Sequence, residues 1–416
     1  MFALAMVFVI PLLAVDVRAE EDQTLTVWCW DPAFNLYAME VAEEIYKHDN
    51  PNFNLEIIET PWADVQTNIN TAAMSMELDS LPDIFLMQDN AFQKNMANFP
   101  QIFVELTDSG VDFSQFAEAK VSASVVDGKN YGVPFDNGTV VFAVRTDYLE
   151  EAGQTIEDYT DITWTEFNEL GKVFLEKTGH PLISMTAESD LINIMMVSAG
   201  AGFFDENGEP YMVENEVLHE VLTVHADIVK SGVLQMVNDW DQYVGTFTSG
   251  NVGGTINGCW ILASVQTAED QAGNWAVTNL PRIEVEGSSN YSNNGGSSWA
   301  VSSNSKNPEL AFDFLAKTFG GSIELYETIL PTSGAMATWL PMADSEIYSE
   351  PQDFFAGQAI YQDLTNFAGE VPPVPIGVYH YEAIDFISGA LQNILNGSDM
   401  VTELESAEQQ VKHLMQ

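Results

Sequence analysis

The segment Thr26–Asn35, TVWCWDPAFN, contains the change from strand to helix on which the predicted fold rests. From position 25 to position 29, apolar side chains alternate with their neighbours, which is the period of a strand. Asp31-Pro32 interrupts this run, and apolar residues at helical spacing follow between positions 38 and 46. The segment therefore predicts a strand followed directly by a helix.

The pattern of strands and helices changes near residues 127–137, which separate a first α/β unit from a second one. Strands are expected at 54–59 and 81–87 with a helix between them, and the strand at 81–87 is almost continuously apolar. Such strands, separated by helices, are typical of a parallel sheet that is covered on both faces. Further on we expect helices at 164–178, 191–199, 216–230, 383–395 and 398–414, and strands at 252–262, 275–280 and 299–302. The predicted fold class is α/β.

Length and charge narrow the possible functions. A chain of 416 residues is long enough for two lobes, each with its own core, and 46% hydrophobic residues argue against disorder. The formal net charge of -49 excludes nucleic acid as a partner, because phosphates would be repelled, and it disfavours anionic membranes. With 62 acidic residues, a pair of neighbouring carboxylates carries little evidence for a site.

The N-terminus has the pattern of an export signal. An apolar block at residues 2–15 precedes the small residue Ala19, and it is shorter than the roughly 20 residues needed to span a bilayer. We interpret residues 1–19 as a signal peptide, with a buried N-terminal element as the alternative. The expected location is extracellular or periplasmic. Cys29 and Cys259 each lie in an apolar run and are expected as buried free thiols, although a bridge between them remains an alternative.

Several short motifs occur along the chain, and their order and spacing carry more information about the protein family than any one of them alone. They include LPDI at 81–84, DGKNYGVP at 127–134, TWTEF at 163–167, FTSG at 247–250, INGCW at 256–260 and SKNPELA at 305–311. Taken together, the chain resembles the extracellular solute-binding proteins of carbohydrate ABC importers, of the maltodextrin-binding type. The resemblance implies a two-lobed clamshell of the periplasmic-binding-protein kind with crossover hinges. It also implies a neutral oligosaccharide ligand, an ABC permease as partner, and a monomer.

The resemblance also implies how the chain is divided between the lobes. The first lobe is expected to contain residues 20–136 and 298–338, and the second lobe residues 137–297 and a helical part at 339–416. Hinges are expected near 136–139, 297–299 and 333–341. No cysteine follows the apolar block where lipid-anchored relatives carry one, so this sequence does not support a lipoprotein.

A sugar site needs flat aromatic rings for the C–H faces and planar amide or carboxylate groups for the hydroxyls. Such groups gather beyond the carboxyl ends of parallel strands. The candidates at these places are Trp30, Asp31, Asn35, Asp89, Asn90, Asp136, Asn137, Trp240, Trp260 and Trp299. The resemblance implies that Trp260 stacks on the sugar, whereas Trp28 and Trp275 are expected to be core residues.

A secreted glycoside hydrolase is the main alternative, and a binding protein for a non-sugar solute is another. A hydrolase needs two carboxylates across the scissile bond, and no motif identifies such a pair. The six histidines show no metal spacing, and neither a Gly-x-Ser-x-Gly elbow nor a phosphate loop occurs. The carboxylates of Asp239 and Asp241 could ligate calcium, but we favour the interpretation that they belong to a solvent-exposed acidic loop. We therefore expect a binding protein that is not an enzyme and has neither cofactor nor metal.

Overall fold

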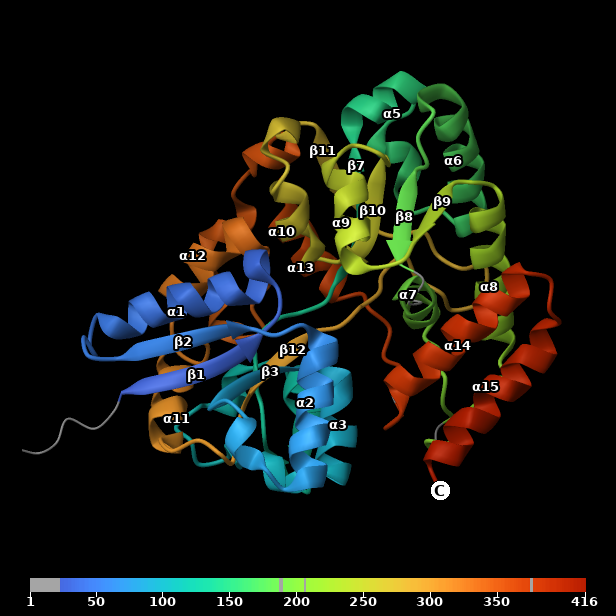
Figure 1. Cartoon of the computed structure of the whole chain (residues 1–416). Helices are drawn as coiled ribbons and strands as arrows, with labels where there is room; N and C mark the ends of the chain where they lie inside the picture. Colours follow the sequence, from blue (N-terminus) through green and yellow to red (C-terminus); the bar gives the residue numbers. More distant parts are fainter. Residues whose placement is uncertain (1–22, 187–189, 206, 375–376) are drawn as a thin grey trace, which may run out of the picture.

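A computed structural model describes residues 23–186, 190–205, 207–374 and 377–416, so the expected signal peptide lies outside the described residues. The fold has two lobes, each built on a five-stranded sheet, with helices around both (Figure 1). Within the described ranges, none of the helices combines the length and the apolar character that crossing a bilayer requires.

The first lobe contains the sheet with strand order β2-β1-β3-β12-β6. Its strands are β1 (Thr24–Cys29), β2 (Asn54–Glu59), β3 (Ile84–Gln88), β6 (Val133–Pro134) and β12 (Ser297–Val301). Its helices are α1 (Tyr37–Lys47), α2 (Trp62–Ser75), α3 (Asp89–Asn98), α4 (Glu118–Ala123), α11 (Pro308–Lys317) and α12 (Ile323–Ser333). A two-residue hairpin, β4 (Val125–Val126) with β5 (Lys129–Asn130), precedes β6.

Strand β1 confirms the pattern on which the prediction rests. Leu25, Val27 and Cys29 are fully buried on one face of the sheet, and Trp28 packs into a second apolar core on the other face, with α2 and α3. Burial on both faces explains why a tryptophan is favourable inside this strand. The residues after Asp31 form one π-helical turn, Pro32–Leu36, before α1 begins.

The second lobe contains the sheet with strand order β11-β7-β10-β8-β9. Its strands are β7 (Val140–Arg145), β8 (Ile183–Thr186), β9 (Leu234–Val237), β10 (Gly254–Gly258) and β11 (Trp275–Thr278). Its helices are α5 (Thr146–Ala152), α6 (Trp164–Thr178), α7 (Asp190–Ser198), α8 (Glu216–Lys230), α9 (Trp240–Thr248), α10 (Ile261–Gln266) and α13 (Ile360–Ala368). Trp275 is fully buried, as expected, and the predicted strand at 252–262 is wrong beyond Gly258, where α10 follows.

Both sheets are mixed, which corrects the expectation of parallel sheets. In the first lobe β12 runs antiparallel to β3, and in the second lobe β7 runs antiparallel to β10. Both exceptional strands enter from the other lobe. A strand that enters at the edge where its neighbours end must run in the opposite direction to them.

Three chain segments connect the lobes and are hydrogen-bonded to one another. The Phe135 N–H donates to the carbonyl of Ser297, and the Asn137 N–H donates to the carbonyl of Met336. Gly138 lies so close to the Asn294 carbonyl that a Cβ atom would be 2.2 Å from its oxygen. The absence of a side chain at Gly138 therefore allows two of the connections to touch.

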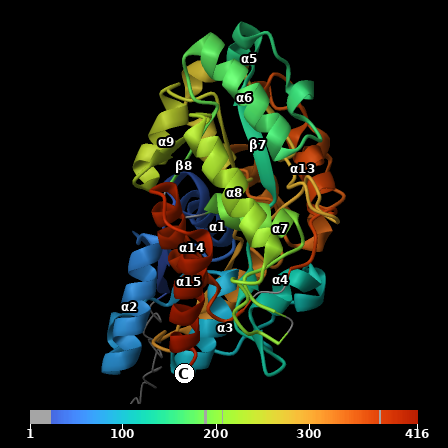
Figure 2. The same cartoon turned by 90° about the vertical axis from the view of Figure 1, so that its right-hand side faces the viewer.

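The C-terminal helices α14 (His380–Leu395) and α15 (Met400–Leu414) form a hairpin along one side of the molecule (Figure 2). In α15, the Glu408 carboxylate accepts hydrogen bonds of 2.9 Å from the N–H groups of Met212 and Val213, which fixes the hairpin to the second lobe. Helix α14 also contacts α3 of the first lobe and α8 of the second. The C-terminal hairpin thus touches both lobes.

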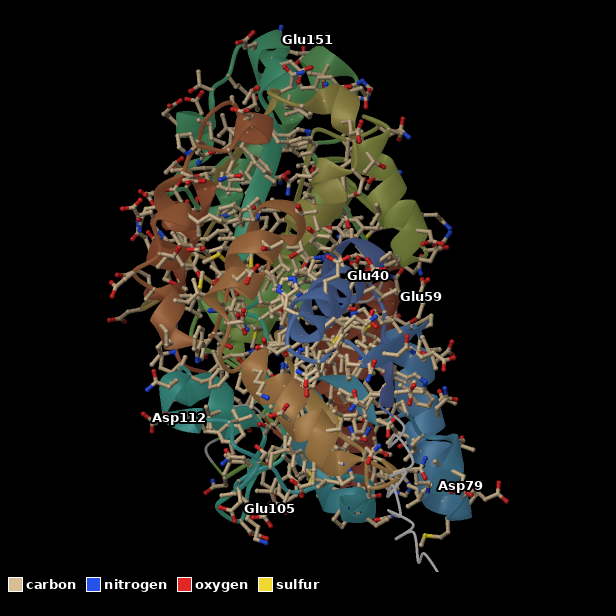
Figure 3. All side chains as sticks on the ribbon, turned by 90° about the vertical axis from the view of Figure 1, so that its left-hand side faces the viewer. Glu40, Glu59, Asp79, Glu105, Asp112 and Glu151 are labelled. Carbon is tan, nitrogen blue, oxygen red and sulfur yellow. The ribbon has the colours of Figure 1, made fainter. Side chains whose placement is uncertain are left out.

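The surface and the interior differ in charge. Figure 3 shows six exposed acids: Glu151 at the far end of the second lobe, and Glu40, Glu59, Asp79, Glu105 and Asp112 on the first lobe, where Glu40 and Glu59 lie near each other. Cys29 and Cys259 are both buried and free, and burial raises the pKa of each thiol far above its usual range. The expected free thiols are thus confirmed, and burial disfavours the thiolate form through which a cysteine reacts.

Candidate functional site

The carboxyl ends of the parallel strands in both sheets face the connections between the lobes. Ser297, at the start of β12, pairs with Gln88 at the end of β3, and Val140, at the start of β7, pairs with Gly258 at the end of β10. The two edges therefore lie on opposite sides of the same crossing segments, as Figure 1 shows. Ligands of open α/β sheets bind at such edges.

On the first-lobe side, two indole rings lie together. Trp30 follows β1 and Trp62 begins α2, with ring centroids 5.2 Å apart and ring planes tilted by 55°. Trp30 is partly buried and packs against both apolar cores. Sequence reasoning identified Trp30 but missed Trp62, because a tryptophan at a helix start has no distinctive local pattern.

Asp31 and Asn35 shape the loop that holds Trp30. The Asn35 carbonyl oxygen accepts hydrogen bonds from the N–H groups of Trp30 (2.9 Å) and Asp31 (3.0 Å), and Asn35 is fully buried. The Asp31 carboxylate accepts from the Ala33 N–H at 2.9 Å and caps the π-helical turn. Burial raises the pKa of Asp31, and backbone hydrogen bonds oppose the rise. The expected sugar contacts are not available to Asn35 in this structure, since it is buried and bonds to the loop.

Asp89, Lys120 and Asp136 form a buried charged group next to the crossings. Lys120 of α4 makes an ion pair with Asp89, which begins α3 and also accepts a hydrogen bond from the Ser298 hydroxyl at 2.8 Å. Asp136 is 2% exposed and accepts from both the N–H (2.8 Å) and the hydroxyl (2.5 Å) of Ser297. Sequence reasoning found both carboxylates but missed Lys120, since only the fold brings α4 to this place.

Gly296 determines how closely this group approaches the connection. Its φ is +102°, a conformation that favours glycine. A Cβ atom there would lie 2.2 Å from the Lys120 ammonium and 2.9 Å from an Asp89 carboxylate oxygen. The connection therefore passes directly over the Lys120–Asp89 pair.

We expect Asp136→Asn to change how stability depends on pH. Burial raises the pKa of Asp136, while the Lys120 charge and the Ser297 hydrogen bonds lower it, with a net rise. A raised folded-state pKa gives stability that is complete below the unfolded value and is lost as the pH rises through the folded value. An asparagine keeps an oxygen for Ser297 but does not ionise. The wild type should therefore lose stability relative to the variant as the pH rises above the unfolded-state pKa of about 4, measured by urea unfolding over a series of pH values. A difference that is independent of pH would contradict the raised pKa.

The N-terminal turn of α14 adds Tyr381 to this region. Its ring centroid lies 6.4 Å from that of Trp62. Burial raises the pKa of Tyr381, the charges of Asp89 and Asp190 raise it further, and a side-chain hydrogen bond with Asn90 lowers it. Tyr381 therefore lies near candidate residues of the first lobe and near the start of α7 in the second. Sequence reasoning missed it, because the helix containing Tyr381 is far from the other site residues in the chain.

On the second-lobe side, Trp260 and Trp240 form a second aromatic pair. Their ring centroids are 5.6 Å apart, and Trp240 is 39% exposed at the start of α9. The Trp260 indole N–H donates to the Asn294 carbonyl at 3.1 Å, which fixes the ring against the connection next to Gly295. Asp239 caps α9 through the Gln242 N–H at 2.8 Å.

Beneath Trp260, buried amides form a hydrogen-bonded chain. Asn193 donates to the Asn294 side chain (3.3 Å), and Asn294 donates to the Asn257 side chain (2.9 Å). Asn257 donates in turn to the hydroxyl of the fully buried Tyr243 at 3.4 Å. Paired buried amides give a rigid support. The position of Trp260 is thereby tied to the connection on one side and to β10 on the other.

Two predicted residues have other surroundings. Trp299 is fully buried in the first lobe, with ring centroids 5.4 Å from Phe135 and 5.2 Å from Phe319, so its ring offers no face to a ligand. The expectation of Trp299 as a platform is therefore corrected, because β12 lies inside the sheet between β3 and β6. Asn137 lies in the first connection, where its carbonyl accepts a hydrogen bond from the Cys259 thiol at 3.1 Å.

Comparison with known proteins identifies the family. The model of the family described as bacterial extracellular solute-binding protein matches residues 42–341, which is more than half of the chain. The chain belongs to this family. Membership groups it with extracellular solute-binding proteins of bacteria. In the described parts of the chain, three or more potential metal ligands do not come together.

Relatives in the solute-binding family cover nearly the whole chain. A lactose-binding protein of Rhizobium radiobacter is 37% identical over 387 residues, which is 93% of this chain and 92% of the relative. An arabinooligosaccharide-binding protein of Halalkalibacterium halodurans is 26% identical over 373 residues, 86% of this chain and 81% of the relative. The expected family resemblance is confirmed.

Solved structures confirm the fold. The ABC transporter associated binding protein from B. animalis subsp. lactis, in complex with beta-1,6-galactobiose, has a TM-score of 0.80 at 18% identity, covering 94% of this chain and 96% of the other. The GacH receptor of Streptomyces glaucescens has a TM-score of 0.79 at 18% identity, covering 94% and 97%. The expected clamshell of two lobes joined by crossovers is the fold of these solute-binding proteins.

Proposed function

We propose that this solute-binding protein captures a neutral oligosaccharide between its two lobes and delivers it to an ABC permease. The observation that carries the proposal is the pair of aromatic groups on either side of the connections, Trp30 with Trp62 and Trp240 with Trp260. Aromatic rings pack on the C–H faces of sugars, and nearby carboxylates and amides bond hydroxyls. Of the residues expected from sequence, Trp30, Asn90, Trp240 and Trp260 fit this site, whereas Asp89 is buried and bonded to Lys120 and Ser298.

The proposed mechanism is a shift between open and closed arrangements of the lobes. A ligand that contacts rings of both lobes makes more interactions when the lobes are close, so its binding favours closure. The hydrogen bonds that join the three connections allow them to act as one hinge. Lobe boundaries at 20–136 and 298–338 against 137–297 and 339–416, and a monomer, belong to this proposal.

The charges favour a neutral ligand. Asp89, Asp136 and Asp190 lie in this region, and the nearby Lys120 is already paired with Asp89. A uronate or a sugar phosphate would need a free Arg or Lys as its partner. A galactoside disaccharide is the first candidate, because the lactose-binding relative is 37% identical over 93% of the chain.

A binding screen tests the function. We expect lactose, β-1,6-galactobiose or an arabinooligosaccharide to raise the free energy of unfolding by about 2.7 kcal/mol at about 100 times its Kd. Digalacturonate, the anionic control, should leave it unchanged. Thermal unfolding and calorimetry measure the effect. Binding of digalacturonate alone would refute a neutral ligand, and monosaccharides released during incubation would favour the glycoside hydrolase instead.

A further inference from the structure

Three consecutive residues at the start of α14 contact both lobes. The His380 ring lies 5.6 Å from the ring of Phe203 in the second lobe. Just before it, Gly377 packs against Phe204 so closely that a Cβ atom would be 2.4 Å from the ring. Together with the bonds from Glu408, these contacts fix the start of α14 to the second lobe.

The next two residues reach the first lobe. Tyr381 packs toward Trp62, and Glu382 forms an ion pair with Lys94 of α3. The side chains of Lys94 and Glu382 are 23% and 19% exposed, so the pair is largely shielded from water. A non-covalent link between the lobes therefore lies beside the candidate site, in addition to the three chain connections.

The link depends on Lys94. Among the ion pairs of the described residues, two have both side chains less than a quarter exposed: Lys94–Glu382 and Lys120–Asp89. The second oxygen of Glu382 is buried without a hydrogen-bond partner. Without Lys94, the Glu382 carboxylate would be shielded from water with no opposite charge, which is unfavourable. The chain has only 13 Lys and Arg against 62 acids, so a substitute cation is scarce.

We propose that the Lys94–Glu382 pair is a latch between the lobes that positions Tyr381 at the ligand site and stabilises the closed arrangement. The latch rests on the proposed function, because closure is the step that it favours. When the lobes separate, both charges become hydrated and the contact is lost. The latch therefore stabilises the closed arrangement even when no ligand is bound. Lys94 affects the ligand site only through the position of Tyr381 and does not touch the sugar.

The experiment measures the distance between the lobes with spin labels. Asp79→Cys in the first lobe and Glu151→Cys in the second place labels at exposed positions, while Cys29 and Cys259 are buried and remain unlabelled. Distances are recorded with and without lactose in the wild type, Lys94→Met, Glu382→Gln and Lys94→Arg. Lys47→Met is the matched control, because its partner Glu43 lies on the same helix.

Lys94→Met and Glu382→Gln should each shift the unliganded distances toward the open arrangement and weaken lactose binding about tenfold, which is about 1.4 kcal/mol. Lys94→Arg keeps the positive charge, so it should keep the wild-type distances and bind lactose within about threefold of the wild-type affinity. Lys47→Met should change neither the distances nor the affinity. If the distances between the labels in Lys94→Met equal those in the wild type, the latch is overturned. A lower melting temperature in that variant would then show only that the ion pair stabilises the fold. Should lactose fail to bind the wild type, the galactoside assignment falls, and the unliganded distances still decide the latch.

Discussion

Trp260→Ala should weaken sugar binding by about 30- to 100-fold, or about 2–3 kcal/mol, while the protein stays folded. The ring is partly exposed, stands beside Trp240 and is held by its N–H bond to the Asn294 carbonyl. Its removal takes away the contact surface of the second lobe without opening a hole in the core. Calorimetric titration with the sugar found in the screen measures the loss.

Two variants make this result specific to the site. Trp260→Phe keeps an aromatic face but loses the hydrogen bond to Asn294, so we expect a loss of about tenfold or less. Tyr211→Ala removes a more exposed ring, 40%, elsewhere on the second lobe, and should leave affinity unchanged. If Trp260→Ala bound sugar as tightly as the wild type, the second-lobe platform would have to be assigned to other residues.

Trp299→Ala should cost about 3–5 kcal/mol of stability, because a fully buried indole would be replaced by a cavity. Phe135 and Phe319 enclose the ring, and their packing would lose contacts on one side. Urea unfolding, followed by near-ultraviolet circular dichroism, measures the change. Trp275→Ala provides a second core site for comparison, since Trp275 is also fully buried.

Sugar affinity separates the core role of Trp299 from the role that the sequence suggested. Trp299→Phe keeps an aromatic ring in the core and should retain the wild-type affinity within about threefold, with a smaller loss of stability than the alanine variant. A variant that kept its stability but lost sugar binding would show that Trp299 faces the ligand after all. The two readouts together therefore decide between core and platform.

Part of the site could be predicted because strand ends are visible in the sequence. Asp89 and Trp260 follow strands, and the fold places both edges at the connections between the lobes. Lys120, Trp62 and Tyr381 could not be found in this way. Each begins or lies in a helix, and each reaches the site through contacts with residues distant in the chain.

The direction of the strands is a second feature that local sequence patterns could not predict. Periodicity identified β12, but it contains no information about which neighbour the strand pairs with. The antiparallel pairing follows from the path of the chain through the second lobe and back. Likewise, nothing local distinguishes Trp299, in the middle of β12, from Trp30 at a strand end.

The sequence by itself determined the α/β elements, the order of motifs that marks the family and the residue types of a sugar site, because these depend on neighbouring side chains. Only the tertiary structure decided which of those residues face each other. It placed Trp299 in the core and bonded the Asn35 side chain to the backbone of its own loop. It also brought Lys94 next to Glu382 and Lys120 next to Asp89. The physical reason is that burial and charge pairing depend on contacts between segments distant in the chain, which form only when the chain folds.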